Sequence, residues 1–179
     1  MSGEVEVRAA ALEEKAALAN LFQLYVHDFS ELWSGTDDGE LDDDGRFAPY
    51  PFLDVYWGDA SRIPLLARID GRLAGFALIN AISHSGLAVD RNVAEFFIVR
   101  KHRRNGAGTA VAQRVFQLYP GLWEAAVARR NTGALAFWRK AVGGCPGLTE
   151  AQELDRRTKE WDGPILRFRI KSAPAGEPE

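Results

Sequence analysis

The segment 94–110 constrains the fold of this chain more than any other, because it joins an apolar run to a helix through a basic turn and two glycines. The first N–H groups of a helix have no partners inside the helix and lie at the positive end of its dipole, so they bind anions. Gly106 and Gly108 allow the backbone to approach a pyrophosphate closely. Arg103 and Arg104 add charged donors at the same turn. The segment therefore predicts a strand, a phosphate-binding turn and a helix.

Composition limits the class of protein. A chain of 179 residues, of which 46% are hydrophobic, suits one globular domain. A formal charge of −3 argues against a general role in nucleic-acid binding. Cys145 is the only cysteine, which excludes an intrachain disulfide and gives no metal-ligand cluster with the scattered histidines. The sequence has no apolar run of the length that a signal peptide or membrane span needs, so we expect a cytoplasmic protein with no nucleic-acid, membrane or metal partner.

Hydrophobic periodicity predicts a mixed α/β order. The expected strands cover 4–9, 64–69, 72–80, 92–100, 122–128 and 164–170, with a less regular one near 149–155, and the expected helices cover 11–32, 106–118 and 131–142. Asp70-Gly71 indicates a tight hairpin. The acidic, glycine-containing stretch 34–45 predicts a solvated loop, whereas the aromatic segment 50–57 fits either a short helix or an extended run. We expect one domain over 1–171 and a disordered tail over 172–179.

Two common phosphate-binding fingerprints do not fit the glycine segment. The third position of the dinucleotide-binding G-x-G-x-x-G/A pattern falls on Val111. The G-K-[ST] of a P-loop is also missing from the segment.

The segment does match another signature. Arg103-Arg104-Asn105-Gly106-Ala107-Gly108 resembles the R/Q-x-x-G-x-G/A motif of the GNAT acetyltransferases, and Asn131 to Lys140 resembles the N-x-x-A-x-x-F-Y-x-K segment of that family. The acidic loop and the aromatic segment are similar to those of a poorly characterised bacterial subgroup. The resemblance implies a single-domain α/β (α+β) GNAT fold. Its sheet would be mixed but mostly antiparallel, splayed between the fourth and fifth strands and covered by helices on both faces.

The resemblance also implies acetyl-CoA as the cofactor, bound in the gap between the splayed strands. Backbone groups of the fourth strand would contact the pantetheine arm, and the turn would hold the pyrophosphate. The implied cofactor-binding residues are Ile98, Val99, Arg100, Arg103, Arg104, Asn105, Gly106, Ala107, Gly108, Thr109, Asn131 and Trp138.

Acyl transfer to an amine needs a base and a stabilised oxyanion. Glu95 occupies the place where several GNAT enzymes carry a glutamate base, and an apolar strand would raise its pKa. The alternative is a structural glutamate that either faces the strand edge or forms an ion pair, for example with Arg68 or Arg91. We expect a backbone N–H near Val99 to face the thioester carbonyl.

The leaving-group side departs from the family pattern. Trp138 occupies the position of the usual general-acid tyrosine, and an indole cannot usefully give up a proton. Trp138 either packs against helix and sheet or stacks on a ligand. Tyr119, Tyr25 and Tyr56 are candidate substitutes for the acid.

The first helix borders the acceptor site in similar proteins, so we expect Tyr25 and Asp28 to contact the substrate together with Glu95. The resulting hypothesis is direct transfer of an acetyl group, in a ternary complex, from acetyl-CoA to a primary amine of a small molecule or peptide. A catalytically inactive acyl-CoA-binding sensor or partner module is the alternative. GNAT proteins often dimerise, so a homodimer is also an expectation.

Overall fold

The computed structural model describes residues 3–172, and the predicted elements are present in the predicted order. The aromatic segment contains a short 3-10 helix, and the less regular run near 149–155 is a full strand. The expected disordered tail lies, apart from its first residue, outside the described residues. The elements are β1 (Val5–Ala9), η1 (Leu12–Glu14), α1 (Lys15–Ser30), η2 (Leu53–Trp57), β2 (Ile63–Ile69), β3 (Arg72–Asn80), β4 (Arg91–Ile98), η3 (Arg100–His102), α2 (Ala107–Leu118), β5 (Gly121–Ala126), α3 (Thr132–Gly143), β6 (Leu148–Arg157) and β7 (Asp162–Ile170).

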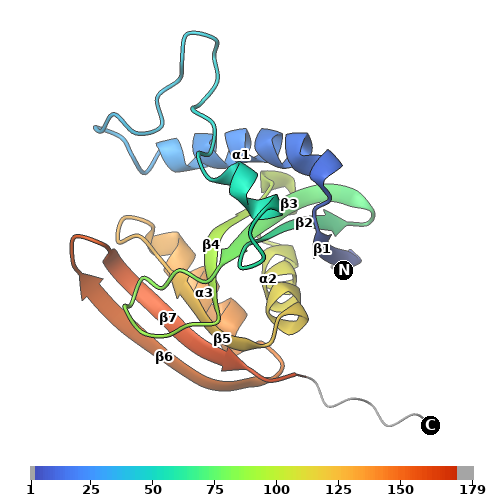
Figure 1. Cartoon of the computed structure of the whole chain (residues 1–179), viewed down its shortest axis with the longest axis vertical. Helices are drawn as coiled ribbons and strands as arrows, with labels where there is room; N and C mark the ends of the chain where they lie inside the picture. Colours follow the sequence, from blue (N-terminus) through green and yellow to red (C-terminus); the bar gives the residue numbers. More distant parts are fainter. Residues whose placement is uncertain (1–2, 173–179) are drawn as a thin grey trace.

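The strands form one seven-stranded sheet in the order β1-β2-β3-β4-β5-β7-β6. Every neighbouring pair is antiparallel except β4 and β5, which run parallel. The β4–β5 pairing is confined to Arg91 with Trp123 and Asn92 with Glu124, and the two strands then diverge (Figure 1). The expected mixed, mostly antiparallel sheet with a splay between the fourth and fifth strands is confirmed.

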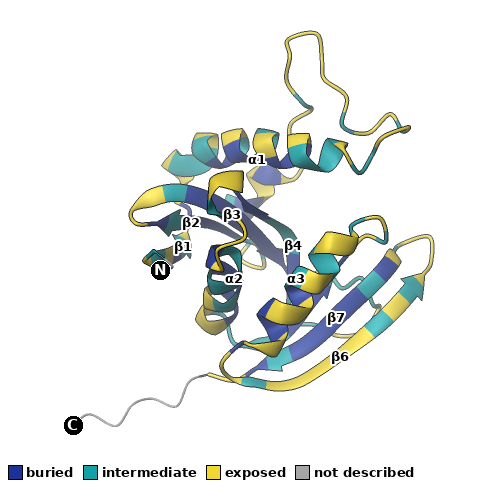
Figure 2. Cartoon of the chain, turned by 180° about the vertical axis from the view of Figure 1, so that it is seen from behind, coloured by how far each residue is buried: buried dark blue, intermediate teal, exposed yellow. Residues whose placement is uncertain are grey.

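Helices cover both faces of the sheet, as expected. On one face, α1 and η2 bury side chains against β2, β3 and β4 around Phe22, Tyr56 and Phe76. On the other face, α2 and α3 pack on the strands around Phe116 and Trp123. Figure 2 shows β7 largely buried in the sheet, while β6 forms an exposed edge. The splay therefore opens between two well-packed halves.

Two loops match the sequence expectations closely. Asp70 and Gly71 both have positive φ angles, of 50° and 72°, as a type I′ hairpin turn requires. The acidic stretch 34–45 is largely exposed and belongs to a long connection that extends away from the sheet beyond α1 (Figure 1).

Candidate active site

The basic turn leads from β4 into α2 and presents free backbone donors. Arg104 and Gly106 have positive φ angles of 65° and 88°, so the backbone changes hand twice in three residues. Such alternation lines up N–H groups around an anion-binding concavity. The side chain of Asn105 accepts a hydrogen bond from the N–H of Ala107 at 3.1 Å. The next N–H groups, of Gly108 and Thr109, have no acceptor among the described residues.

The splay exposes one edge of β4. The N–H of Val99 donates to the carbonyl of Ala74 in β3 at 2.8 Å, so the oxyanion donor that we expect near Val99 is not the N–H of Val99 itself. Because N–H groups alternate sides along an antiparallel ladder, those of Phe96 and Ile98 point away from β3. These groups lie beyond the last residue of β4 that pairs with β5, so they face the gap. They are the backbone donors that a ligand in the gap would meet.

A cavity of about 510 Å³ opens at the splay and continues toward α1 and η2. On the side of the gap it is lined by Val93, Ala94, Phe96, Ala126, Val127, Ala128, Asn131, Ala134, Phe137 and Trp138. Toward α1 it is lined by Tyr25, Phe29, Tyr50, Phe52, Arg62, Asn80, Ile82, His84, Glu95 and Trp161. One continuous space therefore joins the exposed edge of β4 to a set of aromatic and ionisable side chains.

Glu95 lies where the two parts of this cavity meet. The residue before it, Ala94, is the extra residue of a bulge in β4, since Glu95 pairs with Leu78 and Val93 with Ile79. Desolvation by its surroundings raises the pKa of Glu95 from 4.5 to about 7, although the hydroxyls of Tyr25 and Tyr50 favour the charged form. The Tyr25 hydroxyl donates a hydrogen bond to Glu95 Oε2.

The ion-paired alternative for Glu95 does not hold. Arg68 lies 3.9 Å from Glu14, and Arg91 stacks its guanidinium over the ring of Tyr119 at 5.4 Å. No arginine or lysine in the described chain forms an ion pair with Glu95. A carboxyl group that titrates near neutral pH at the floor of a cavity is typical of a general base.

Trp138 combines packing with a place in the cavity wall. Its ring is 7% exposed and packs edge-on against Phe96 at 5.1 Å. Asn131 caps α3 by accepting a hydrogen bond from the N–H of Ala134 at 3.2 Å, and it lines the same cavity. Tyr119 lies outside the cavity, while Tyr25 is tied to Glu95 and the hydroxyl of Tyr56 is buried.

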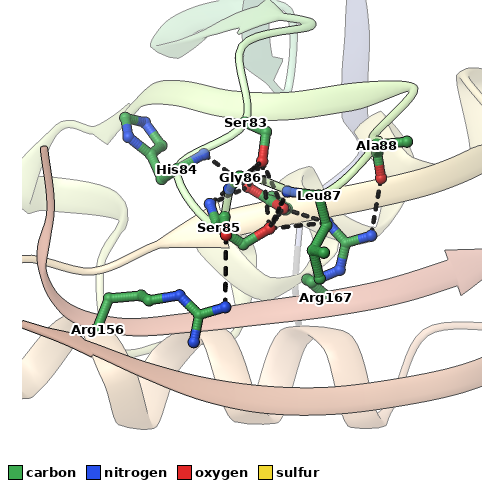
Figure 3. Close-up of polar contacts among 9 residues, drawn as sticks. Ser83, His84, Ser85, Gly86, Leu87, Ala88, Arg156 and Arg167 are labelled. Carbon is green, nitrogen blue, oxygen red and sulfur yellow. Dashed lines mark hydrogen bonds and ion pairs between the residues drawn. The ribbon is translucent and has the colours of Figure 1, made fainter. Parts of the chain in front are cut away.

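A buried polar network fixes the loop that carries His84, which lines the cavity (Figure 3). Glu124 is completely buried in β5 and forms an ion pair with Arg167 of β7. Glu124 also accepts hydrogen bonds from the backbone of His84 at 2.9 Å and from the hydroxyls of Ser83 and Ser85. Burial alone would raise the pKa of Glu124, but these hydrogen bonds hold it below its ordinary value. The network pins the 81–90 loop, so His84 is held where its ring packs on Trp161 at 4.4 Å.

Asp28 does not lie with Glu95. It belongs to a separate pocket together with Glu31, Arg100, Arg103 and Arg104. Its carboxylate accepts a hydrogen bond from Arg100 Nε at 2.9 Å and another from Arg103. Burial acts to raise the pKa of Asp28, but the two arginines hold it below the usual range. The structure thus places Asp28 beside the basic turn rather than in the Glu95 cavity, where we expected it.

Tyr50, Arg62 and Trp161 belong to the cavity but were not among the expected site residues. Tyr50 had a signal in the sequence, since it belongs to the aromatic segment 50–57. Arg62 and Trp161 had none, because each reaches the cavity from a connection whose path the local sequence does not specify.

Among residues 3–172, no group of histidine, cysteine and acidic side chains could hold a metal ion. No helix within the same range is both long and apolar enough to cross a bilayer. Cys145 is buried, and burial raises the pKa of its thiol.

Comparison with known proteins identifies the family. The model of the acetyltransferase (GNAT) family matches residues 18–143. A search of curated proteins by sequence found no significant match.

Solved structures share the fold at low sequence identity. An acetyltransferase from Thermus thermophilus superposes with a TM-score of 0.64 at 17% identity, covering 96% of this chain and 100% of its own. The ribosomal-protein-S18-alanine N-acetyltransferase from Escherichia coli gives a TM-score of 0.56 at 12% identity, covering 98% and 100%. A proposed acetyltransferase from Salmonella typhimurium, solved with its cofactor acetyl-CoA, gives 0.51 at 12% identity, covering 98% of each chain.

Proposed function

Because the chain belongs to the GNAT acetyltransferase family, we propose that it transfers an acetyl group from acetyl-CoA to a primary amine of a small molecule or peptide. The two substrates would react directly in a ternary complex. The observation that carries this proposal is the place of Glu95, whose carboxyl group lies in one cavity with the exposed edge of β4 and has a pKa of about 7.

The described residues suit acetyl-CoA. The unpaired N–H groups of Gly108 and Thr109 are donors for a pyrophosphate, and no atom lies within 4 Å of the position a Cβ would take on Gly106. The N–H groups of Phe96 and Ile98 are donors for the amide-bearing arm. When bound, acetyl-CoA supplies a thioester carbonyl that an amine can attack. The neighbour from Salmonella typhimurium, which carries acetyl-CoA, supports this choice of cofactor.

Glu95 would act as the base for the attacking amine. Near neutral pH about half of a group with this pKa is ionised, so Glu95 can accept a proton and release it again. The backbone N–H groups of Phe96 and Ile98 are the candidates for the oxyanion donor expected near Val99, because they face the gap where an oxyanion would form. Positioning both reactants in one cavity would supply much of the remaining acceleration, since this effect is worth on the order of 7–11 kcal/mol.

Trp138 cannot protonate the leaving thiolate. A free thiol has a pKa near ~8.5, so the thiolate can leave without an acid. The neighbour from Escherichia coli is named for acetylating an alanine of a ribosomal protein, which is an amine acceptor. That name supports nitrogen as the acceptor atom.

An amine-panel assay tests this proposal. The purified protein is mixed with acetyl-CoA and a panel of primary amines, and free thiol release is followed alongside product mass. We expect one or more amines to be acetylated, and Glu95→Gln to lower turnover at neutral pH without changing the affinity for acetyl-CoA. Tight binding of acetyl-CoA with no transfer to any amine would favour the inactive binding module instead.

A further inference from the structure

The acceptor part of the cavity carries one acidic and one basic side chain. Of the ionisable residues that line it, Glu95 provides a carboxyl group and Arg62 a guanidinium, and the others are His84 and the phenols of Tyr25 and Tyr50. Burial lowers the pKa of His84, which favours the neutral ring. Tyr50 lies close to both Glu95 and Arg62: besides burial, the charge of Glu95 acts to raise the pKa of its hydroxyl, and the charge of Arg62 acts to lower it. Opposite charges thus flank one short stretch of cavity.

Arg62 has unused capacity to bind an anion. Its side chain is 17% exposed, and its buried Nε makes no hydrogen bond beyond the ion-pair contact with Asp59. Its ion-pair partner in the described chain is Asp59, which is half exposed and 3.4 Å away, so this pair contributes little. The guanidinium also packs over the ring of Tyr56 at 5.4 Å, which fixes its position.

Two further buried groups near this part of the cavity lack hydrogen-bond partners. They are the Tyr56 hydroxyl, next to Arg62, and the indole N–H of Trp161, which lines the cavity. Buried polar groups in proteins are nearly always satisfied, so unpaired ones at a binding cavity call for a ligand that completes them. The guanidinium of Arg62 and the indole N–H of Trp161 line the same cavity and can both donate, and a carboxylate is a common small group that accepts such hydrogen bonds.

Apart from Asn80, the remaining walls of this part of the cavity are apolar. Phe29, Phe52 and Ile82 line it, and Phe52 and Ile82 are 54% and 51% exposed in the absence of any ligand. Large apolar side chains at the mouth of a cavity gain free energy when a ligand covers them. They favour an acceptor with an apolar side chain.

We infer that the acceptor is an α-amino acid with an apolar side chain, whose amine lies beside Glu95 and whose carboxylate binds Arg62. This inference rests on the proposed function. The ammonium group loses one proton to solvent before attack, and Glu95 accepts the second. One N–C bond forms to the acetyl carbon, and the C–S bond breaks as sulfur leaves with the bonding pair as a thiolate. The product is an N-acetylamino acid.

Matched acceptors test the role of the carboxylate. L-phenylalanine, L-phenylalaninamide and phenethylamine share the amine and the ring but differ in the carboxylate, so kcat/KM is measured for each with the wild type. We expect L-phenylalanine to be preferred. Arg62→Met should lower its kcat/KM by about 10- to 100-fold, the range for hydrogen bonds to a charged group. The same change should leave phenethylamine unaffected, and Arg62→Lys should restore part of the preference.

Arg91→Met is the matched control. Arg91 also packs over a tyrosine ring at 5.4 Å and has a buried Nε without a partner, but it lies outside the cavity. We expect this variant to keep the preference for L-phenylalanine.

A binding measurement separates this inference from the proposed function. L-phenylalanine is titrated calorimetrically into the protein saturated with CoA. Binding that depends on Arg62 but gives no turnover would support the amino-acid site and contradict the transferase. Turnover of phenethylamine or the amide at least as fast as L-phenylalanine, unchanged in Arg62→Met, would overturn the amino-acid site and leave the transferase standing. No binding and no turnover for L-phenylalanine would also overturn it.

Discussion

Replacing Glu95 with glutamine should stabilise the fold at alkaline pH while removing the base. The pKa of Glu95 is raised from 4.5 to about 7 by desolvation, so ionising it costs the folded state free energy that the unfolded chain does not lose. Glutamine has the same shape and can still accept the hydrogen bond from Tyr25. The variant therefore isolates the effect of the charge.

Proton linkage determines whether the stability of the fold rises or falls with pH. The folded wild type binds its proton more tightly than the unfolded chain, so its stability is greatest below pH 4.5 and falls until the pH passes about 7. Glutamine does not titrate, so the stability of the variant does not decrease in this way as the pH rises. The advantage of Glu95→Gln should reach about 3 kcal/mol at high pH, and should grow by roughly 2.5 kcal/mol between about pH 5 and pH 8.

Urea denaturation at these two pH values measures the effect, on protein free of acetyl-CoA. Glu14→Gln is the control, because hydrogen bonds from Arg8 lower the pKa of Glu14 to about 2. Glu14 is ionised in both states over this pH range, so its variant should be less stable than the wild type by an amount that does not change between them.

A stability difference for Glu95→Gln that is the same at both pH values would refute the reasoning. It would mean that Glu95 ionises as easily in the folded protein as in the unfolded chain. The raised pKa, and with it the assignment of Glu95 as a base that works near neutral pH, would then be lost.

The remaining predictions concern the rate, the cofactor and the fold. The kcat/KM for an amine of low pKa should rise through about pH 7 as Glu95 ionises, and Tyr25→Phe should move the inflection to higher pH because a hydroxyl that stabilises the carboxylate is gone; an unmoved inflection would contradict this. Gly108→Glu should abolish acetyl-CoA binding in calorimetry, since it brings a carboxylate to the anion-binding turn and a Cβ to 3.4 Å from Phe137; Gly143→Glu, where the Cβ meets open space, should bind normally. Asp28→Asn should tighten CoA binding, most clearly at low salt, because Asp28 competes for Arg100 and Arg103; unchanged affinity would show that these arginines do not meet the cofactor. Glu124→Leu should cost about 3–5 kcal/mol in urea denaturation by leaving Arg167 buried and unpaired, and adding Arg167→Leu should recover part of that loss.

The turn proposed to hold the acetyl donor could be predicted from the sequence, because the residues that form it are close together in the chain. The turn at 103–108 combines arginines, glycines and a helix start within a few residues, and the structure shows the strand, the turn and α2 in that order. The hairpin at Asp70-Gly71 was likewise determined by its own two residues. Glu95 could be singled out because it is a lone acidic residue in an otherwise apolar strand.

The direction of individual backbone groups could not be predicted. N–H groups alternate along a strand, so an error of one position moves a donor to the opposite edge. The bulge at Ala94 and the pairing of β4 with β3 decide that the N–H of Val99 is used inside the sheet while that of Ile98 is free. This register depends on contacts between distant segments, which the pattern of one strand does not contain.

Contacts between side chains that are far apart in the sequence could not be predicted either. Asp28 was expected to face the substrate from the first helix, but the rotation of α1 brings it to Arg100 and Arg103. Arg62 follows η2 and the short polar connection 58–61, so nothing in its neighbourhood indicated that it would line the same cavity as Glu95.

The donor and the acceptor would be recognised by different kinds of groups. The donor would be held by backbone N–H groups of β4 and α2, which any side chain on these elements leaves in place as long as Gly106 and Gly108 are kept. The acceptor would be held by side chains of α1, of the segment before η2 and of the connections that carry Arg62, His84 and Trp161. Substitutions in those connections can therefore change the acceptor without disturbing the donor site. Arg62 is the clearest case, because it would bind one end of the acceptor and does not belong to the pocket at the basic turn.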